Sequence, residues 1–379
     1  MTFTESGAIE YPNQASRFQP EDLDHMLIYL EDNGGFDDLY FATDSFVKVK
    51  RGGGSFSFVP RELSYFEVND FIDRIYGGAN AAARVQEGKE IDTSYELAPE
   101  DRRGVRFRYR VNAAGIRCRS SKRGIAITLR SIKPDPVPLE VLKVEQEIID
   151  NFFPRQGLVL VVGETGSGKS TLLSSMIRHS LEQPGPGKTY LTYEAPIEYI
   201  YDNVQIGNNV IQQSEVGSNV ESFASGVRNA LRRSPEIILI GEARDRETIE
   251  ACVRAANTGH LVFATVHANS VAETMRRMAG EFPPDIQEAR MREIISSLRM
   301  CVAQYLARRP EGGRIALREY LVFTNEVRDQ LLDAPIEKLI PLTNKMVGDY
   351  GQTMASDAEA KHRAGAISSE VYKTVIAGI

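Results

Sequence analysis

Apolar and polar positions follow two different patterns along the chain. Up to about residue 130 they alternate in short runs, which is typical of strands with one buried face. These runs are Leu39–Phe41, Phe46–Val49, Phe56–Val59, Arg106–Val111 and Gly124–Arg130. Helices are expected at Glu21–Glu31 and Glu67–Tyr76. The pattern predicts a small α+β domain over residues 21–132, after a loosely ordered, flexible arm over residues 1–20.

Beyond residue 140 the runs become almost entirely apolar. They are Leu158–Val162, Thr189–Tyr193, Ile237–Ile240 and Leu261–Val266. Such runs predict a parallel sheet covered on both faces by helices, one of them expected at Thr171–Leu181. From about Ala272 the chain is expected to be mostly helical, with an interruption at Gly312–Gly313. We assign an α/β domain to residues 141–310 and a mostly helical C-terminal extension to residues 311–379.

A proline-rich stretch separates the two patterns. Lys133-Pro-Asp-Pro-Val-Pro138 holds three prolines in six residues, which favours an extended and rather stiff connection. We predict a linker over residues 133–140, and two domains suit a chain of 379 residues.

The composition is that of a folded protein and narrows the function classes. Apolar residues make up 42% and charged residues 26% of the chain, and 45 Lys and Arg against 52 Asp and Glu give a net charge of −7. This balance speaks against direct nucleic-acid binding, although it does not exclude a local basic patch. Three widely spaced cysteines fit neither a disulfide framework nor a zinc site. Because no apolar run has signal-peptide or membrane-span character, we expect a cytoplasmic protein that meets a membrane only through partners.

A glycine-rich motif follows the first of the apolar runs. Gly163-Glu-Thr-Gly-Ser-Gly-Lys169-Ser170 matches G-x-x-x-x-G-K-[ST], in which backbone N–H groups turn inward and hold phosphate oxygens. The motif predicts Lys169 on the β- and γ-phosphates of a nucleotide and Ser170 on Mg²⁺. The residues assigned to nucleotide binding are Gly163, Thr165, Gly166, Ser167, Gly168, Lys169, Ser170 and Thr171.

Phosphoryl transfer to water also needs an acidic residue, to hold Mg²⁺ or to polarise the attacking water. Glu242 follows the apolar run Ile237–Ile240 and is assigned to both tasks. Glu194 and Glu198 follow another predicted strand of the same sheet. Which of the three carboxylates is the general base stays open.

Two histidines bracket the run Leu261–Val266. His267 follows its carboxyl end, the edge at which open α/β sheets bind ligands, whereas His260 precedes it. Either histidine suits a structural hydrogen-bonding role or a sensor of the γ-phosphate, and for His267 we favour the sensor.

In this order the motifs resemble those of the PilT-like secretion ATPases of type II and type IV secretion systems and type IV pili. The resemblance rests on the phosphate loop Gly163–Ser170, the acidic box Thr192–Tyr199, the second acidic motif Ile237–Asp245 and the histidine box Thr258–Ala268. The resemblance spans about residues 100–335. Within the family, the chain is most similar to the DotB/TraJ-type branch of Dot/Icm-type secretion and conjugation systems. Two departures from the family pattern are Ala195, where the acidic box usually has aspartate, and the C-terminal segment Glu326–Leu331, which differs from that of pilus retraction motors.

The resemblance implies a RecA-like ATPase domain after a PAS-like domain, a homohexameric ring, and ATP bound in the cleft between the two domains of a subunit. It also implies that Arg110 and Arg130 of the first domain reach toward a phosphate site. Our leading hypothesis is therefore an ATP hydrolase that powers a type IV secretion, conjugation or pilus-like machine at the cytoplasmic face of the inner membrane. The alternatives are a RecA-like nucleic-acid translocase and a scaffold that binds nucleotide without turnover.

Overall fold

The computed structural model describes residues 10–13, 15–52, 54–78, 80–120, 123–132 and 135–378. The chain divides into two compact units, Met1–Pro134 and Asp135–Ile379, which we call unit 1 and unit 2. The division falls within the predicted linker, whose residues 133 and 134 lie outside the described part.

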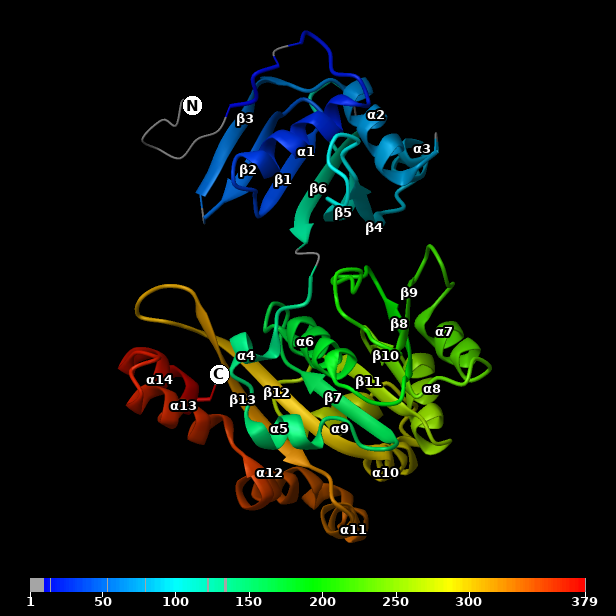
Figure 1. Ribbon diagram of the computed structural model, residues 1–379, viewed down its shortest axis with the longest axis vertical. Coiled ribbons are helices and arrows are strands. Elements are labelled where there is room, and N and C mark those ends of the chain that lie inside the picture. Colours follow the sequence, from blue (N-terminus) through cyan, green and yellow to red (C-terminus); the bar gives the residue numbers. More distant parts are fainter. Residues whose placement is uncertain are drawn as a thin grey trace. The chain divides into compact units, whose positions relative to one another are not determined.

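Unit 1 is built on an antiparallel sheet with the strand order β3-β2-β1-β6-β5-β4 (Figure 1). Its elements are α1 (Asp22–Asp32), β1 (Asp38–Ala42), β2 (Phe46–Arg51), β3 (Gly54–Glu62), α2 (Tyr65–Tyr76), α3 (Ala81–Gln86), β4 (Ile91–Leu97), β5 (Phe107–Ile116) and β6 (Gly124–Ile132). Leu27 of α1 and Phe71 of α2 share one core with Val49, Val111 and Leu129 of the strands. The helices thus cover one face of the sheet, which explains the alternation in the sequence.

The predicted N-terminal arm differs from the expectation over its described residues. Tyr11 and Phe18 are 4% and 0% exposed, within the core of unit 1. The Tyr11 N–H donates to the Phe58 carbonyl at 2.8 Å, and the Phe18 N–H donates to the Glu67 carboxylate at 2.8 Å. Two buried aromatic rings hold this otherwise polar segment against the unit. Residues 1–9 and 14 of the arm lie outside the described part.

Unit 2 contains a larger mixed sheet with the strand order β14-β13-β12-β7-β11-β10-β8-β9. From β12 to β9 in this order, each strand runs parallel to its neighbours. The strand β13 runs antiparallel to both of its neighbours, β12 and β14. The strands are β7 (Gly157–Val162), β8 (Thr189–Glu194), β9 (Val210–Glu215), β10 (Ile237–Ile240), β11 (Leu261–Val266), β12 (Leu298–Arg308), β13 (Arg314–Val322) and β14 (Gly351–Gln352).

Helices lie on both sides of this sheet (Figure 1). They are α4 (Leu139–Leu142), α5 (Gln146–Asn151), α6 (Lys169–Glu182), α7 (Phe223–Ala230), α8 (Arg246–Asn257), α9 (Val271–Ala279), α10 (Gln287–Ser297), α11 (Asn325–Asp333), the short 3₁₀ helix Ile336–Lys338, α12 (Leu339–Tyr350), α13 (Met354–Arg363) and α14 (Ser369–Ile376). Leu160 of β7 belongs to the core with α8 and α9, whereas Val159 and Val161 belong to the core with α6. Because both faces are buried, the central strands need apolar residues throughout.

Residues 298–322 correct the expectation of a mostly helical chain after Ala272. They form the hairpin of β12 and β13, which pair from Met300–Val322 to Arg308–Arg314. The turn contains Gly312 and Gly313, both with positive φ, at 94° and 78°. β12 is buried over most of its length, so the two-residue alternation that marks a half-buried strand is missing, and a long apolar run resembles a helix. The segments after β13 are helical as expected, apart from the short strand β14.

Within the described ranges, we find no helix that combines the length and the apolar character needed to cross a bilayer.

Candidate active site

The phosphate loop connects β7 to α6, in the predicted strand-loop-helix arrangement. Gly163, Gly166 and Gly168 have φ values of 149°, 79° and 83°. Residues that carry a side chain rarely adopt these backbone angles. A Cβ atom at Gly163 would lie 2.4 Å from the Gln304 carbonyl oxygen and 2.5 Å from Ser167 Oγ. The loop therefore requires its glycines both for the direction of the backbone and for close packing on β12.

Lys169, the first residue of α6, points back into the loop. Its ammonium donates to the carbonyl oxygens of Gly163 and Glu164, at 2.8 Å each. Burial lowers the pKa of Lys169, and the carboxylates of Glu242, Glu198 and Glu164 oppose that shift. The ammonium is thus preorganised within the loop and lies in the field of the acidic residues predicted to act with it.

Other residues of the loop differ in their exposure. Thr165 and Gly166 are exposed, whereas Ser167 is buried. Ser170 is partly buried in the first turn of α6. The Thr171 hydroxyl is already engaged, because it forms a hydrogen bond of 2.7 Å with the Tyr199 hydroxyl. This contact links the acidic box to the helix of the phosphate loop.

The carboxyl ends of the parallel strands bring the predicted residues to one edge of the sheet. Glu242 follows β10, where the Gly241 N–H donates to the Tyr193 carbonyl (2.8 Å) and the Ala243 N–H donates to the Thr265 carbonyl (2.9 Å). The Glu242 carboxylate lies 3.4 Å from His267 Nε2 and 4.0 Å from Arg244 Nη1. Glu242 is therefore held between two neighbouring strands, with His267 beside it.

Glu194 ends β8 and has an unusual environment. Its Oε1 accepts hydrogen bonds from Thr192 Oγ1 at 2.7 Å and Gln213 Nε2 at 3.2 Å. Burial nevertheless raises the pKa of Glu194 to about 7. The nearby negative charge of Glu198 acts in the same direction. A carboxyl group that titrates near neutral pH suits proton transfer.

His260 lies at the opposite edge of the sheet from the phosphate loop. It precedes β11, its carbonyl accepts from the Gly157 N–H at 2.9 Å, and its Nδ1 lies 3.3 Å from the Ala255 carbonyl oxygen. This position favours the structural role for His260 and separates it from His267.

Arg110 and Arg130 are direct neighbours in unit 1. They face each other in register on β5 and β6, and their side chains are 44% and 66% exposed. Arg110 pairs with Asp92 at 3.0 Å, and Arg130 pairs with Asp38 at 2.7 Å. The two guanidinium groups thus lie on the same face of the sheet, the one opposite the helices.

Sequence reasoning missed two glutamines next to the site. Gln213 donates to Glu194, and the Gln304 amide donates to the carbonyl of Ser167 in the phosphate loop at 2.7 Å. Gln213 lies in the polar strand β9 and offers no signal. Gln304 did offer one, because it is a polar residue within the apolar run Met300–Ala307 and is only 5% exposed.

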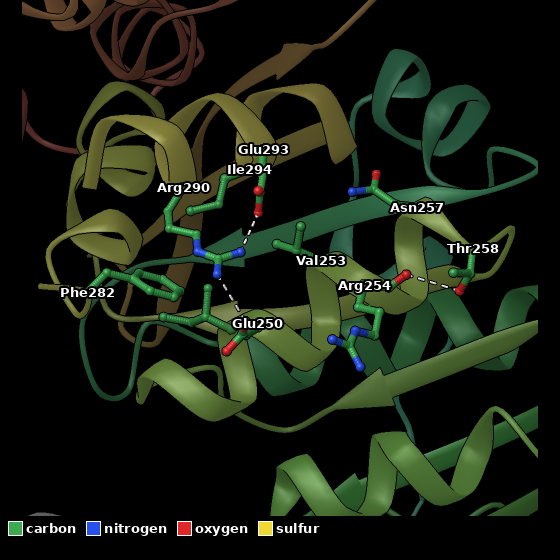
Figure 2. A pocket seen from close by; sticks show the side chains of 10 residues that line it. Glu250, Val253, Arg254, Asn257, Thr258, Phe282, Arg290, Glu293 and Ile294 are labelled. Atoms are coloured by element: carbon green, nitrogen blue, oxygen red, sulfur yellow. Dashed lines mark hydrogen bonds and ion pairs between the residues drawn. The ribbon is translucent and has the colours of Figure 1, made fainter. Parts of the chain in front are cut away.

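A separate hollow of about 270 Å³ lies between α8 and α10 (Figure 2). Arg290 donates to Glu250 at 3.1 Å and to Glu293 at 2.7 Å, and its guanidinium lies 5.4 Å from the centre of the Phe282 ring. Since two carboxylates already balance this arginine, we do not assign the hollow to a nucleotide.

Comparisons with known proteins show the family of the chain. The sequence profile of the family described as "Type II/IV secretion system protein" matches residues 71–361. A twitching motility protein of Neisseria gonorrhoeae is 36% identical, over 82% of this chain and 79% of that protein. The crystal structure of the Legionella pneumophila ATPase DotB has a TM-score of 0.89 and 41% identity, covering 98% of this chain and 99% of that one. The pilus retraction motor PilT with bound ADP has a TM-score of 0.76 and 29% identity, covering 94% and 97%. The chain therefore belongs to the family of type II/IV secretion system ATPases.

Proposed function

We propose that this protein hydrolyses ATP and uses the released energy to drive a type IV secretion or conjugation machine, or a related pilus-like one. The observation that carries the proposal is the convergence at one sheet edge of the phosphate loop with its buried Lys169, the Glu242 carboxylate and His267. Support for the nucleotide comes from the similar pilus retraction motor PilT, whose crystal structure contains bound ADP.

Each residue of the site has a defined task in this proposal. Lys169 exchanges its two carbonyl partners for phosphate oxygens and neutralises charge that develops on them. Glu242 accepts a proton from the attacking water, and His267 holds the Glu242 carboxylate in place and contacts the γ-phosphate. Glu194 and Glu198 remain the other candidates for the proton acceptor.

Mg²⁺ fits the oxygen donors of the site. Among the described residues no group of three or more His, Cys, Asp or Glu side chains could hold a metal on its own. Ser170 and Glu242 are the residues that would hold the ion, because hydroxyl and carboxylate oxygens are ligands that Mg²⁺ prefers, and substrate phosphates would supply further oxygens. When bound, Mg²⁺ would neutralise phosphate charge.

We further propose that unit 1 is the PAS-like domain, that unit 2 is the RecA-like ATPase domain, and that the chain forms a six-subunit ring at the cytoplasmic face of the inner membrane through partner proteins. Support comes from the family membership and from the exposed guanidinium groups of Arg110 and Arg130. An arginine that can exchange a carboxylate for a phosphate completes many phosphoryl-transfer sites.

The test is phosphate release by the purified chain with Mg-ATP, measured with and without single- and double-stranded DNA at physiological ionic strength. We expect turnover that DNA changes by less than about twofold, because a chain with a net charge of −7 attracts few phosphates. Several-fold stimulation by DNA, with binding that weakens steeply as salt rises, would instead support the nucleic-acid translocase. Nucleotide binding without any turnover would support the scaffold.

A further inference from the structure

Buried polar side chains connect the phosphate loop to a distant part of unit 2. Gln304 donates from Nε2 to the Ser167 carbonyl at 2.7 Å and accepts from Arg318 Nε at Oε1, at 2.9 Å. Gln304 and Arg318 are register partners on β12 and β13 and are 5% and 2% exposed. A single amide thus joins the loop to a buried guanidinium group.

The Arg318 guanidinium continues the connection into the segment 139–145, which we call the connector because it follows the boundary between the units. Its Nη1 donates to Glu145 Oε2 at 2.9 Å and to the Lys143 carbonyl at 3.3 Å. Its Nη2 donates to the Leu142 carbonyl at 3.2 Å. Lys143 has a φ of 46°, so the backbone turns sharply where Arg318 holds it.

A second branch reaches helix α13. The backbone N–H of Arg318 donates to Asp357 Oδ2 at 2.8 Å. The Lys361 ammonium lies 2.6 Å from the Asp357 carboxylate and 3.3 Å from the Glu145 carboxylate. Two cations and two carboxylates therefore balance one another at the junction of β13, the connector and α13. The whole network lies within unit 2.

The phosphate loop packs tightly on this network. A Cβ at Gly168 would lie 2.9 Å from Gln304 Nε2, and one at Gly163 would lie 2.4 Å from the Gln304 carbonyl oxygen. The phosphate loop and Gln304 are thus in direct contact, through which the state of the loop can act on Gln304. Since an apolar replacement of a buried ion pair is often no less stable, stability alone gives little reason for a buried arginine here.

We propose that Gln304 and Arg318 are positioning residues that hold the phosphate loop and transmit its occupancy to the connector and to α13. The inference rests on the proposed nucleotide-binding function. It adds a route by which the nucleotide state of unit 2 reaches the segment that joins the two units.

The experiment compares the wild-type chain with Gln304→Met, which keeps the length of the side chain and removes both hydrogen bonds. Gln352→Ala is the matched control, since Gln352 is a nearby glutamine whose side-chain amide donates to the Arg318 backbone carbonyl, at 3.0 Å. ADP affinity is measured by calorimetry. Backbone hydrogen exchange at saturating Mg-ADP is then followed in residues 163–170, 139–145 and 354–363.

In the wild type we expect ADP to slow exchange in all three segments. In Gln304→Met we expect affinity about tenfold weaker, from the loss of a buried hydrogen bond. Saturating ADP should still protect residues 163–170 there, but the response in 139–145 and 354–363 should disappear. Gln352→Ala should respond like the wild type. If Gln304 had only a structural role, Gln304→Met would lower the melting temperature, and saturating ADP would still slow exchange in the two distant segments, 139–145 and 354–363.

Glu145→Gln provides a second variant, which weakens the contact of the connector with Arg318 and its ion pair with Lys361 of α13, and which serves if Gln304→Met does not fold. We expect ADP affinity within about twofold of the wild type, with the response of 139–145 reduced. A full distant response in either variant would overturn the inference, as would a wild type whose loop is protected while both distant segments are unaffected. A wild type that does not bind ADP at all would overturn the proposed function, and this inference with it.

Discussion

At the scale of single residues, Lys169 shows how the site is prepared for an anion. Two neutral carbonyl oxygens hold its ammonium at 2.8 Å, and charged phosphate oxygens form stronger hydrogen bonds than these do. Burial lowers the pKa of Lys169, and nearby carboxylates counteract this effect. The loop thus keeps the lysine in position without neutralising it through a direct ion pair with one fixed carboxylate.

Glu242→Gln tests the proton acceptor. The amide keeps nearly the shape of the carboxylate but cannot accept a proton, so we expect ATP binding to persist and turnover to fall by about 10²-fold or more. Phosphate release and nucleotide binding are measured on the same preparation. If Glu242→Gln turns over normally while Glu194→Gln or Glu198→Gln does not, the catalytic base belongs to the acidic box.

Glu194 gives stability a defined pH dependence. Because its pKa is about 7 rather than 4.5, the folded state keeps a proton between these pH values that the unfolded state has lost. Its contribution to the free energy of unfolding therefore falls as pH rises through this window. Glu194→Gln lacks this loss, so its stability relative to the wild type should rise by up to about 3 kcal/mol between pH 4 and pH 8.

Urea unfolding at several pH values measures this difference. Glu311→Gln, in the exposed turn between β12 and β13, controls for the removal of one surface carboxylate. A stability difference for Glu194→Gln that is the same at pH 4 and pH 8 would contradict the assigned environment of Glu194.

At the scale of elements, helix α8 begins at Arg246, four residues after Glu242, and the side chain of Asp245 caps it. Asp245 accepts from the Thr248 N–H at 2.9 Å and from the Thr248 hydroxyl at 3.0 Å. Asp245→Ala should lower the free energy of unfolding by about 1 kcal/mol, whereas Asp245→Asn, which keeps an acceptor oxygen, should lose much less. Equal losses in the two variants, measured by urea unfolding, would show that the charge and not the cap stabilises this helix start.

The sequence predicted elements well where burial gives a clear pattern. Most strands of unit 1 alternate, and β7, β8, β10 and β11 of unit 2 are short apolar runs, so both kinds were found. Two further strands, β4 and β9, lie at sheet edges and were also missed. In β9 (Val210–Glu215) polar residues occupy both faces. The strand β4 does alternate, with Asp92, Ser94 and Glu96 opposite Ile91, Tyr95 and Leu97, and was overlooked. The long β12 was mistaken for helix because its burial on both faces removes the alternation.

The candidate site was predictable to the extent that it follows from local motifs and sheet topology. The phosphate loop is a contiguous motif, and the parallel sheet brings Glu242 and His267 together at its carboxyl edge. Contacts such as that of Gln304 with Ser167 were not predictable, because 137 residues separate the two in sequence. The raised pKa of Glu194 likewise comes mainly from burial, which no local pattern reveals.

At the scale of the whole molecule, the arginine pair of unit 1 tests cooperation between chains. We expect Arg110→Ala to lower turnover by about 10³-fold, as the loss of an arginine finger does. Lys169→Ala and Arg110→Ala chains are then mixed in varied ratios and phosphate release is measured. If the arginine acts on a neighbouring subunit, mixtures should recover part of the wild-type turnover. The absence of recovery at every ratio would place the arginine's action within its own chain or remove it from the reaction.

Phosphate release and mass in solution, measured together on the wild type and on Lys169→Ala with Mg-ATP, test the central claim most directly. We expect the wild type to hydrolyse ATP and to assemble into a ring of six. Lys169→Ala should keep its melting temperature within a few degrees and lose turnover almost completely, because the ammonium that neutralises the phosphates is gone. A folded Lys169→Ala chain that hydrolyses ATP at the wild-type rate would contradict the account.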